Sequence, residues 1–185
     1  MRGLLPESRQ RITHHISRFG RAEGGSSAIE FALLGSIFSV LLLNVVDVSF
    51  AIWAQMEVNY AAEVGAQAAL ATCSGGTMPA TTNCANMNSA ITAAAQSTSL
   101  GTAVALASDS PSETYYCTTS DNSLQSVGSY SSPPTPFNCA AAGNASATPG
   151  DYVTVQVTYT FAPLFAGLSL IQGQTLSGSG MQRLQ

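Results

Sequence analysis

Lysine is absent from the 185-residue sequence, and only 9% of the residues are charged although 45% are hydrophobic. In a soluble globular domain about a quarter of the residues are usually charged. Part of the apolar content is therefore expected somewhere other than in a water-exposed domain. Histidine is also scarce, because only His14 and His15 occur.

These absences exclude several kinds of chemistry from residues 73–185. That part has neither histidine nor lysine, so a Ser-His-Asp triad, a Cys-His pair and a Schiff-base lysine are unavailable there. It also lacks a C-x-x-C zinc pair and a glycine-rich phosphate loop. We therefore predict that the chain is not an enzyme and has no cofactor, metal or small-molecule substrate. Its scattered acids are expected on the solvated surface: Asp109, Glu113, Asp121 and Asp151.

The few charges are unevenly distributed. Five of the six arginines precede residue 22, whereas eight of the ten acids lie at or beyond Glu30. A basic head could bind nucleic acid, but this one lacks the interleaved aromatic and lysine residues of such a patch. Basic flanks are common beside membrane spans. The asymmetry thus indicates membrane topology, and no nucleic acid is expected as a partner.

A long apolar run follows the basic head. Residues 31–53 supply the roughly 20 mostly apolar residues that cross a lipid bilayer, interrupted by Asn44 and Asp47. The preceding arginines predict a cytoplasmic N-terminus and a periplasmic or exterior C-terminal domain, in a protein that crosses the membrane once. A cleaved secretory signal is the alternative, which the length of the run and its two polar residues disfavour.

Asp47 within this run has two open interpretations. A carboxylate in lipid costs several kcal/mol unless it is paired or protonated, so it normally faces protein. Asp47 lies six residues before Trp53, a candidate interfacial aromatic residue. It therefore either packs against protein or is hydrated at the outer interface.

The residues just before the span, GGSSAIEF at 24–31, combine the end of a basic leader with a glutamate in an apolar helix. Cleavage after Gly25 would explain Glu30, because the new ammonium of Ser26 could neutralise it within one chain or between packed neighbours. Either charge buried alone would carry a desolvation penalty of several kcal/mol. The alternative is an interfacial acid at the cytoplasmic end of an ordinary anchor.

This segment resembles prepilin processing sites, in which a prepilin peptidase cuts after glycine and glutamate is the fifth mature residue. The Glu30-Phe31 pair is most similar to the Flp/Tad branch. Residues 59–69 (NYAAEVGAQAA) resemble an alanine-rich segment of the TadE-like family, with Gln67 where arginine is usual. Residues 151–164 (DYVTVQVTYTFAPL) resemble the strand and proline turn that close TadE-like and TadG-like proteins.

The resemblance implies a TadE-like minor pilin or pseudopilin, a structural or assembly component of a Tad/Flp-type pilus used for adhesion and surface colonisation. Gly25 and Ser26 would form the processing site, and Glu30 and Phe31 would act in assembly. The implied partners are prepilin peptidase and other pilin or Tad components, and the protein would stay in the inner membrane or enter the extracellular pilus. The alternative is an uncleaved, membrane-anchored periplasmic interaction protein.

Helical periodicity continues beyond the span. Small residues recur at i, i+3 and i+4 from Val58 to Ala69, and no proline interrupts residues 26–78. We expect one helix over residues 26–72, whose small face packs closely on the outer domain or on another subunit.

Four cysteines follow this helix, which indicates disulfides in an oxidising compartment: Cys73, Cys84, Cys117 and Cys139. Three pairings are possible, and proximity in sequence favours Cys73–Cys84 with Cys117–Cys139. Periodicity predicts a short helix over 89–98 and strands over 102–107, 113–118 and 152–161.

The expected fold is α+β. A basic cytoplasmic leader, cleaved in the mature chain, comprises residues 1–25, and a transmembrane and stalk helix comprises residues 26–72. A small disulfide-containing extracytoplasmic domain with an antiparallel sheet comprises residues 73–185. Residues 119–150 within it, rich in Ser, Pro, Asn and Gly, are expected to form a disordered loop.

Overall fold

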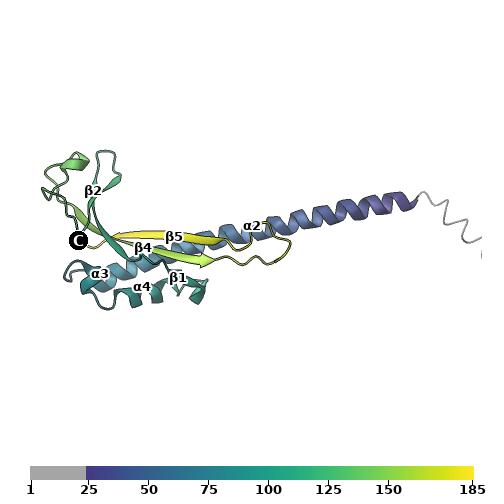
Figure 1. Cartoon of the computed structure of the whole chain (residues 1–185), viewed down its shortest axis with the longest axis horizontal. Helices are drawn as coiled ribbons and strands as arrows, with labels where there is room; N and C mark the ends of the chain where they lie inside the picture. Colours follow the sequence, from purple (N-terminus) through teal and green to yellow (C-terminus); the bar gives the residue numbers. More distant parts are fainter. Residues whose placement is uncertain (1–23) are drawn as a thin grey trace, which may run out of the picture. The chain divides into compact units, whose positions relative to one another are not determined.

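The computed structural model describes residues 24–185 (Figure 1). The chain divides into two compact units, one ending at Val45 and the other comprising residues 46–185. The described part of the first unit is entirely helical. The predicted leader, residues 1–25, lies almost wholly outside the described residues.

Helix α2 (Gly24–Cys73) confirms the continuous helix expected from the sequence. Its residues include no proline, and alanine, leucine and methionine favour the helical state. In its first half the apolar side chains are exposed, whereas from Asp47 onward one face becomes buried. The two halves of one helix therefore face different surroundings.

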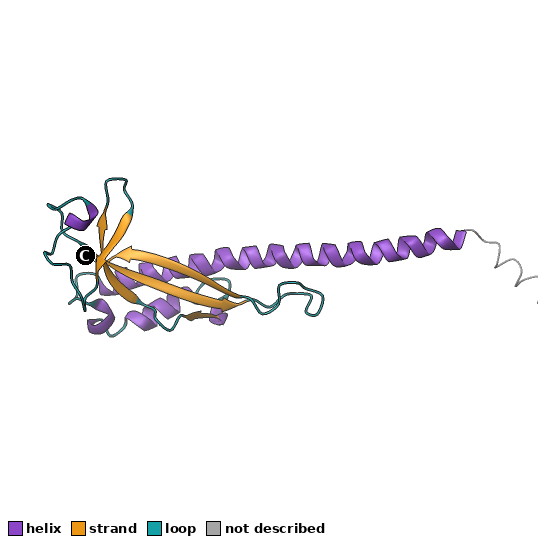
Figure 2. Cartoon of the chain, turned by 45° about the horizontal axis from the view of Figure 1, so that its top comes forward, coloured by secondary structure: helices purple, strands orange, loops and turns teal. Residues whose placement is uncertain are grey.

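A five-stranded antiparallel sheet forms the second unit together with the C-terminal half of α2 (Figure 2). Strand β4 (Gly150–Thr160) is central, and β5 (Thr175–Arg183) pairs with it from Tyr152 to Thr160. Strands β1 (Val104–Leu106) and β2 (Ser112–Thr118) share the other edge of β4, and β3 (Leu124–Gly128) pairs with β2. The predicted α+β class with an antiparallel sheet is confirmed.

The core lies between the sheet, α2 and α4 (Met87–Ala95). Val153, Val155 and Val157 alternate along β4 with polar residues and are completely buried. From α4, Met87 and Ile91 are buried one helical turn apart. Full burial of one such aliphatic side chain contributes about 1.5–3 kcal/mol, so these layers account for much of the stabilisation of the unit.

The small face of α2 packs directly on the sheet domain, which is the first of the two contacts expected for it. Val58 and the alanines of this face have no exposed surface. Two glycines of β5 lie against the helix backbone, since a Cβ on Gly178 would be 2.7 Å from the Val58 carbonyl oxygen and one on Gly180 would be 2.6 Å from the Ala62 carbonyl carbon. The fully buried alanines are Ala61, Ala62, Ala66 and Ala69.

The two disulfides join the cysteines that proximity in sequence predicted as partners. Cys73 and Cys84 are joined at a Cα–Cα distance of 5.9 Å, and Cys117 and Cys139 at 5.6 Å. The first links the end of α2 to the segment after α3 (Ala80–Asn83). The second links β2 to the start of η2 (Ala140–Ala142).

The structure differs from the predicted disordered loop over 119–150. Strand β3 and helix η2 lie in that segment, because pairing with β2 and the Cys117–Cys139 bond hold it. Strand β5 was missed, since it contains Gly178 and Gly180 and glycine is depleted in strands. The short helix was expected over 89–98 and forms over Met87–Ala95. Strands were expected over 102–107, 113–118 and 152–161, and β1, β2 and β4 occupy these positions.

The second compact unit begins at Val46, earlier than the predicted domain boundary at residue 73. Its core includes five fully buried α2 residues from Val58 to Ala69. The C-terminal half of α2 is therefore a core element of the domain and not a separate stalk.

Candidate assembly and membrane interface

The first half of α2 presents large apolar side chains on every side. Among the described residues, α2 alone is long and apolar enough to cross a membrane, judged by length and composition. An exposed apolar surface of this extent marks an interaction site or a membrane segment. The exposed large side chains of residues 27–45 are Ile29, Phe31, Leu33, Leu34, Ile37, Phe38, Val40, Leu41, Leu42 and Val45.

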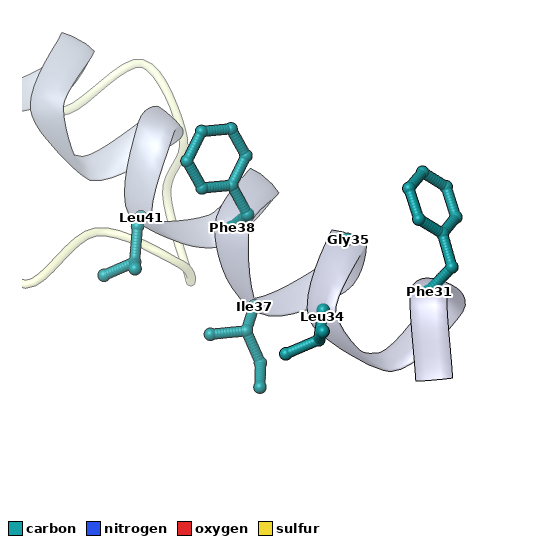
Figure 3. A pocket seen from close by; sticks show the side chains of 6 residues that line it. All are labelled: Phe31, Leu34, Gly35, Ile37, Phe38 and Leu41. Carbon is teal, nitrogen blue, oxygen red and sulfur yellow. The ribbon is translucent and has the colours of Figure 1, made fainter. Parts of the chain in front are cut away.

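Figure 3 shows how these side chains are arranged around Gly35. The rings of Phe31 and Phe38 point to one side of the helix with Gly35 between them, and Leu34 and Ile37 point to the other side. Apart from the two adjacent residues and the backbone of the helix itself, no atom lies within 4 Å of the position that a Gly35 Cβ would occupy. The result is an open hollow on a helix surface, lined only by apolar groups. It offers packing space to lipid chains or to another helix, and no polar anchor for a small molecule.

The predicted processing and assembly residues all lie at the beginning of α2. Gly25 and Ser26 belong to its first turn, and Glu30 and Phe31 follow within the next turn. Phe31 is 79% exposed, and Glu30 is also exposed. The helix therefore presents Glu30 and Phe31 on the surface, where a neighbouring subunit could reach them. Cleavage after Gly25 and the ion pair with Ser26 remain predictions.

Asp47 packs against protein, which decides between its two interpretations. It has no exposed surface, and its Oδ1 accepts a hydrogen bond of 2.9 Å from the backbone N–H of Leu164. Its Oδ2 is buried without a hydrogen-bond partner among the described residues. A carboxylate in the apolar part of α2 thus holds the loop that joins β4 to β5. The position of Asp47 in the helix was predictable from the sequence, but its partner, which lies 117 residues away, was not.

A second buried acid, Asp151, corrects a prediction. The sequence predicts that Asp151 is solvated, but only 3% of the residue is exposed and neither carboxylate oxygen has a hydrogen-bond partner in the described part of the chain. It lines a cleft of about 390 Å³ with Tyr115, Tyr130 and Arg183. Burial, and then the negative charge of Glu113, raise the pKa of Asp151 from 3.8 to about 6. The sequence did contain a signal for this burial. Asp151 lies two residues before Val153, so both side chains point to the same face of the strand.

Glu113 has a structural role that was also missed. Its Oε1 accepts a hydrogen bond of 2.8 Å from the backbone N–H of Ala80, and its Oε2 accepts one of 2.8 Å from the N–H of Thr81. These are unsatisfied donors at the start of a helix, where a carboxylate is favourable. Glu113 thereby ties α3 to β2.

The other two acids of residues 73–185 are solvent-exposed, as predicted. Asp109 and Asp121 are exposed. Hydrogen bonding, first from the Thr119 hydroxyl, lowers the pKa of Asp121. Within residues 24–185, no three His, Cys, Asp or Glu side chains are grouped so that they could hold a metal ion.

These features define a protein with one candidate membrane span and a small, disulfide-bonded α+β domain. The family model described as TadE-like protein matches residues 25–67, which cover the beginning of α2, its apolar half and most of its small face. The resemblance to TadE-like proteins is thereby confirmed for this segment, which is less than half of the chain. No curated protein and no solved structure gives a significant match.

Proposed function

We propose that this chain is a minor pilin or pseudopilin of a Tad/Flp-type pilus, with a structural role in assembling the fibre or its base. The observation that carries the proposal is the TadE-like match over residues 25–67, which includes the exposed apolar half of α2. Such a helix needs a bilayer before assembly and apolar neighbours after it. Prepilin peptidase and other Tad components would be its partners.

The proposed topology is a single pass through the bacterial inner membrane, with the arginine-rich head in the cytoplasm and the sheet domain in the periplasm. The charge distribution supports this orientation. Two disulfides in the sheet domain support an oxidising compartment for that side. Entry into the extracellular pilus would follow extraction of α2 from the membrane.

In the proposed mechanism, cleavage after Gly25 removes the leader and exposes the ammonium of Ser26. Glu30 would then be neutralised by that ammonium, in its own subunit or in a neighbouring one, as the helices pack. A pair of opposite charges is tolerated in an apolar assembly, whereas each charge alone is strongly disfavoured. Phe31, next to Glu30 and exposed, would provide an apolar contact between helices.

Mass spectrometry of the protein isolated from its native host tests the cleavage. A mature chain that begins at Ser26 is the expected result. A chain that retains its leader would contradict the pilin proposal and would favour an uncleaved, membrane-anchored interaction protein.

The variant Glu30→Ala tests the assembly role separately. We expect it to be processed and inserted normally but to be lost from assembled pili or from the complex with its Tad partners. Glu63→Ala is the matched control, because Glu63 is an exposed acid of the same helix outside the proposed span. Equal assembly of the two variants would refute the role of Glu30.

A further inference from the structure

The loop between β4 and β5, residues 161–174, has an unusual surface for a water-exposed loop. It contains no charged residue. Leu170 is 87% exposed, Leu164 59% and Leu168 51%. Figure 2 shows the loop extending from the ends of β4 and β5 beyond the sheet. Three neighbouring leucines are exposed at one end of the domain. Together they form an apolar surface of the kind that marks a membrane or protein interaction site.

The position of this loop along α2 indicates what covers it. Leu164 donates its backbone N–H to Asp47, which lies in the apolar run of the helix. Asp47 precedes Trp53 by six residues, so it lies about 9 Å further along the helix axis. If Trp53 marks the membrane–water boundary, that displacement matches the depth of about 5–10 Å at which interfacial apolar surfaces are buried.

The backbone of the loop suits such an environment. Irregular backbone is excluded from the hydrocarbon layer because its polar groups would lack hydrogen bonds. Here the N–H groups of Leu168 and Ser169 bond to the Phe165 carbonyl oxygen at 3.0 and 3.1 Å, and the N–H of Phe161 bonds to the Gln174 oxygen at 2.8 Å. Asp47 accepts the N–H of Leu164 at 2.9 Å. These bonds remove part of the cost of bringing the loop to the edge of the hydrocarbon.

We propose that the β4–β5 loop inserts Leu164, Leu168 and Leu170 into the outer leaflet of the bilayer that α2 crosses. The domain would then have a second membrane contact that does not span. Asp47 would act as the internal acceptor that holds the loop against the helix at this depth. This inference rests on the proposed membrane anchor, and it adds the prediction that the sheet domain is held against the membrane surface before assembly.

Tryptophan fluorescence with lipid-bound quenchers tests the proposal on the full chain. Trp53→Phe removes the single native tryptophan, and Leu170→Trp or Leu168→Trp then places a reporter in the loop. Each protein is reconstituted in vesicles of phosphatidylethanolamine and phosphatidylglycerol that carry bromine near the headgroup or near the chain ends. Both positions are exposed, so the substitutions leave the core unchanged.

We expect both loop reporters to lose most of their emission to the shallow bromines and to be shielded from aqueous iodide. Leu124→Trp in the same background is the matched control, because Leu124 is 44% exposed on β3 and should show the opposite pattern. A loop reporter quenched by iodide and not by lipid would overturn the proposal. Shielding from both quenchers would also overturn it and would indicate that the loop packs against protein, in its own chain or in a second copy.

Phe38→Trp separates this inference from the proposed span. Phe38 lies in the middle of the apolar half of α2, and its replacement should be quenched by bromine near the chain ends. A quenched residue 38 with unquenched loop reporters would refute only the loop insertion. An unquenched residue 38 would refute the membrane anchor, and the loop insertion that rests on it.

Discussion

At the scale of single residues, Asp151 makes the stability of the sheet domain depend on pH. Its pKa is raised from 3.8 to about 6 by burial and by the charge of Glu113. The folded state therefore binds this proton more tightly than the unfolded state does. As a result, the free energy of unfolding falls as the pH rises through the window from about 4 to about 6.

We expect Asp151→Asn to weaken this dependence and to stabilise the domain near neutral pH, because it removes a buried charge without hydrogen-bond partners. Thermal unfolding of the full chain in detergent, followed by circular dichroism at about pH 4 and about pH 7, measures the effect. Asp109→Asn, which changes an exposed acid, is the control. An Asp151→Asn protein that keeps the pH dependence of the unmodified protein would refute this account.

At position 180, the close packing of β5 against α2 requires glycine. A Cβ there would lie 2.6 Å from the carbonyl carbon of Ala62 and 2.7 Å from the Cα of Glu63. Because both are backbone atoms, they cannot move aside as a flexible side chain would. We expect Gly180→Ala to lower the free energy of unfolding by about 1–3 kcal/mol, the range for overpacked cores.

Chemical denaturation followed by circular dichroism measures this loss of stability. Ser179→Ala is the matched control, since Ser179 is the exposed neighbour on the same strand. Equal stability of the two variants would show that β5 can move away from α2, which the close contact excludes.

At the scale of elements, we expect residues 119–149 to depend on the Cys117–Cys139 disulfide for their structure. It closes a loop of 22 residues around β3 and η2. Removing both cysteines as Cys117→Ala and Cys139→Ala should cost about 2–4 kcal/mol. Because β3 pairs only with β2, hydrogen exchange should accelerate mainly in residues 119–149.

Hydrogen exchange read by mass spectrometry separates this effect from a general loss of stability. The matched control is the removal of the Cys73–Cys84 disulfide, which closes a loop of 11 residues elsewhere in the domain. Accelerated exchange in residues 119–149 in both variants, or in neither, would contradict the assigned role.

The elements that the sequence predicts well are those with a strong local period. Val153, Val155 and Val157 alternate with polar residues, and this pattern alone locates β4. Strand β5 lacks that signal because Gly178 and Gly180 are required by the close approach of α2, a contact between distant segments. The partner of Asp47 was hidden for the same reason, since Leu164 lies 117 residues away.

At the scale of the whole molecule, α2 belongs to two environments along its length. Its first half exposes apolar side chains, whereas its second half supplies Val58, Ala61, Ala62, Ala66 and Ala69 to the core, all without exposed surface. The sheet alone would leave Val153, Val155 and Val157 uncovered on that side. The folded domain is therefore expected to require the second half of α2 but not the first.

Two shortened chains test this division. A chain that begins at Val46 should fold with a thermal midpoint close to that of the full chain in detergent, because it keeps Asp47 and every α2 residue of the core. A chain that begins at Ser74 should fail to fold, because it loses these residues and the Cys73–Cys84 disulfide. Circular dichroism and cooperative thermal unfolding distinguish the two. A cooperative transition in the shorter chain would mean that the sheet and α4 form a core on their own, and that the second half of α2 is only docked onto it.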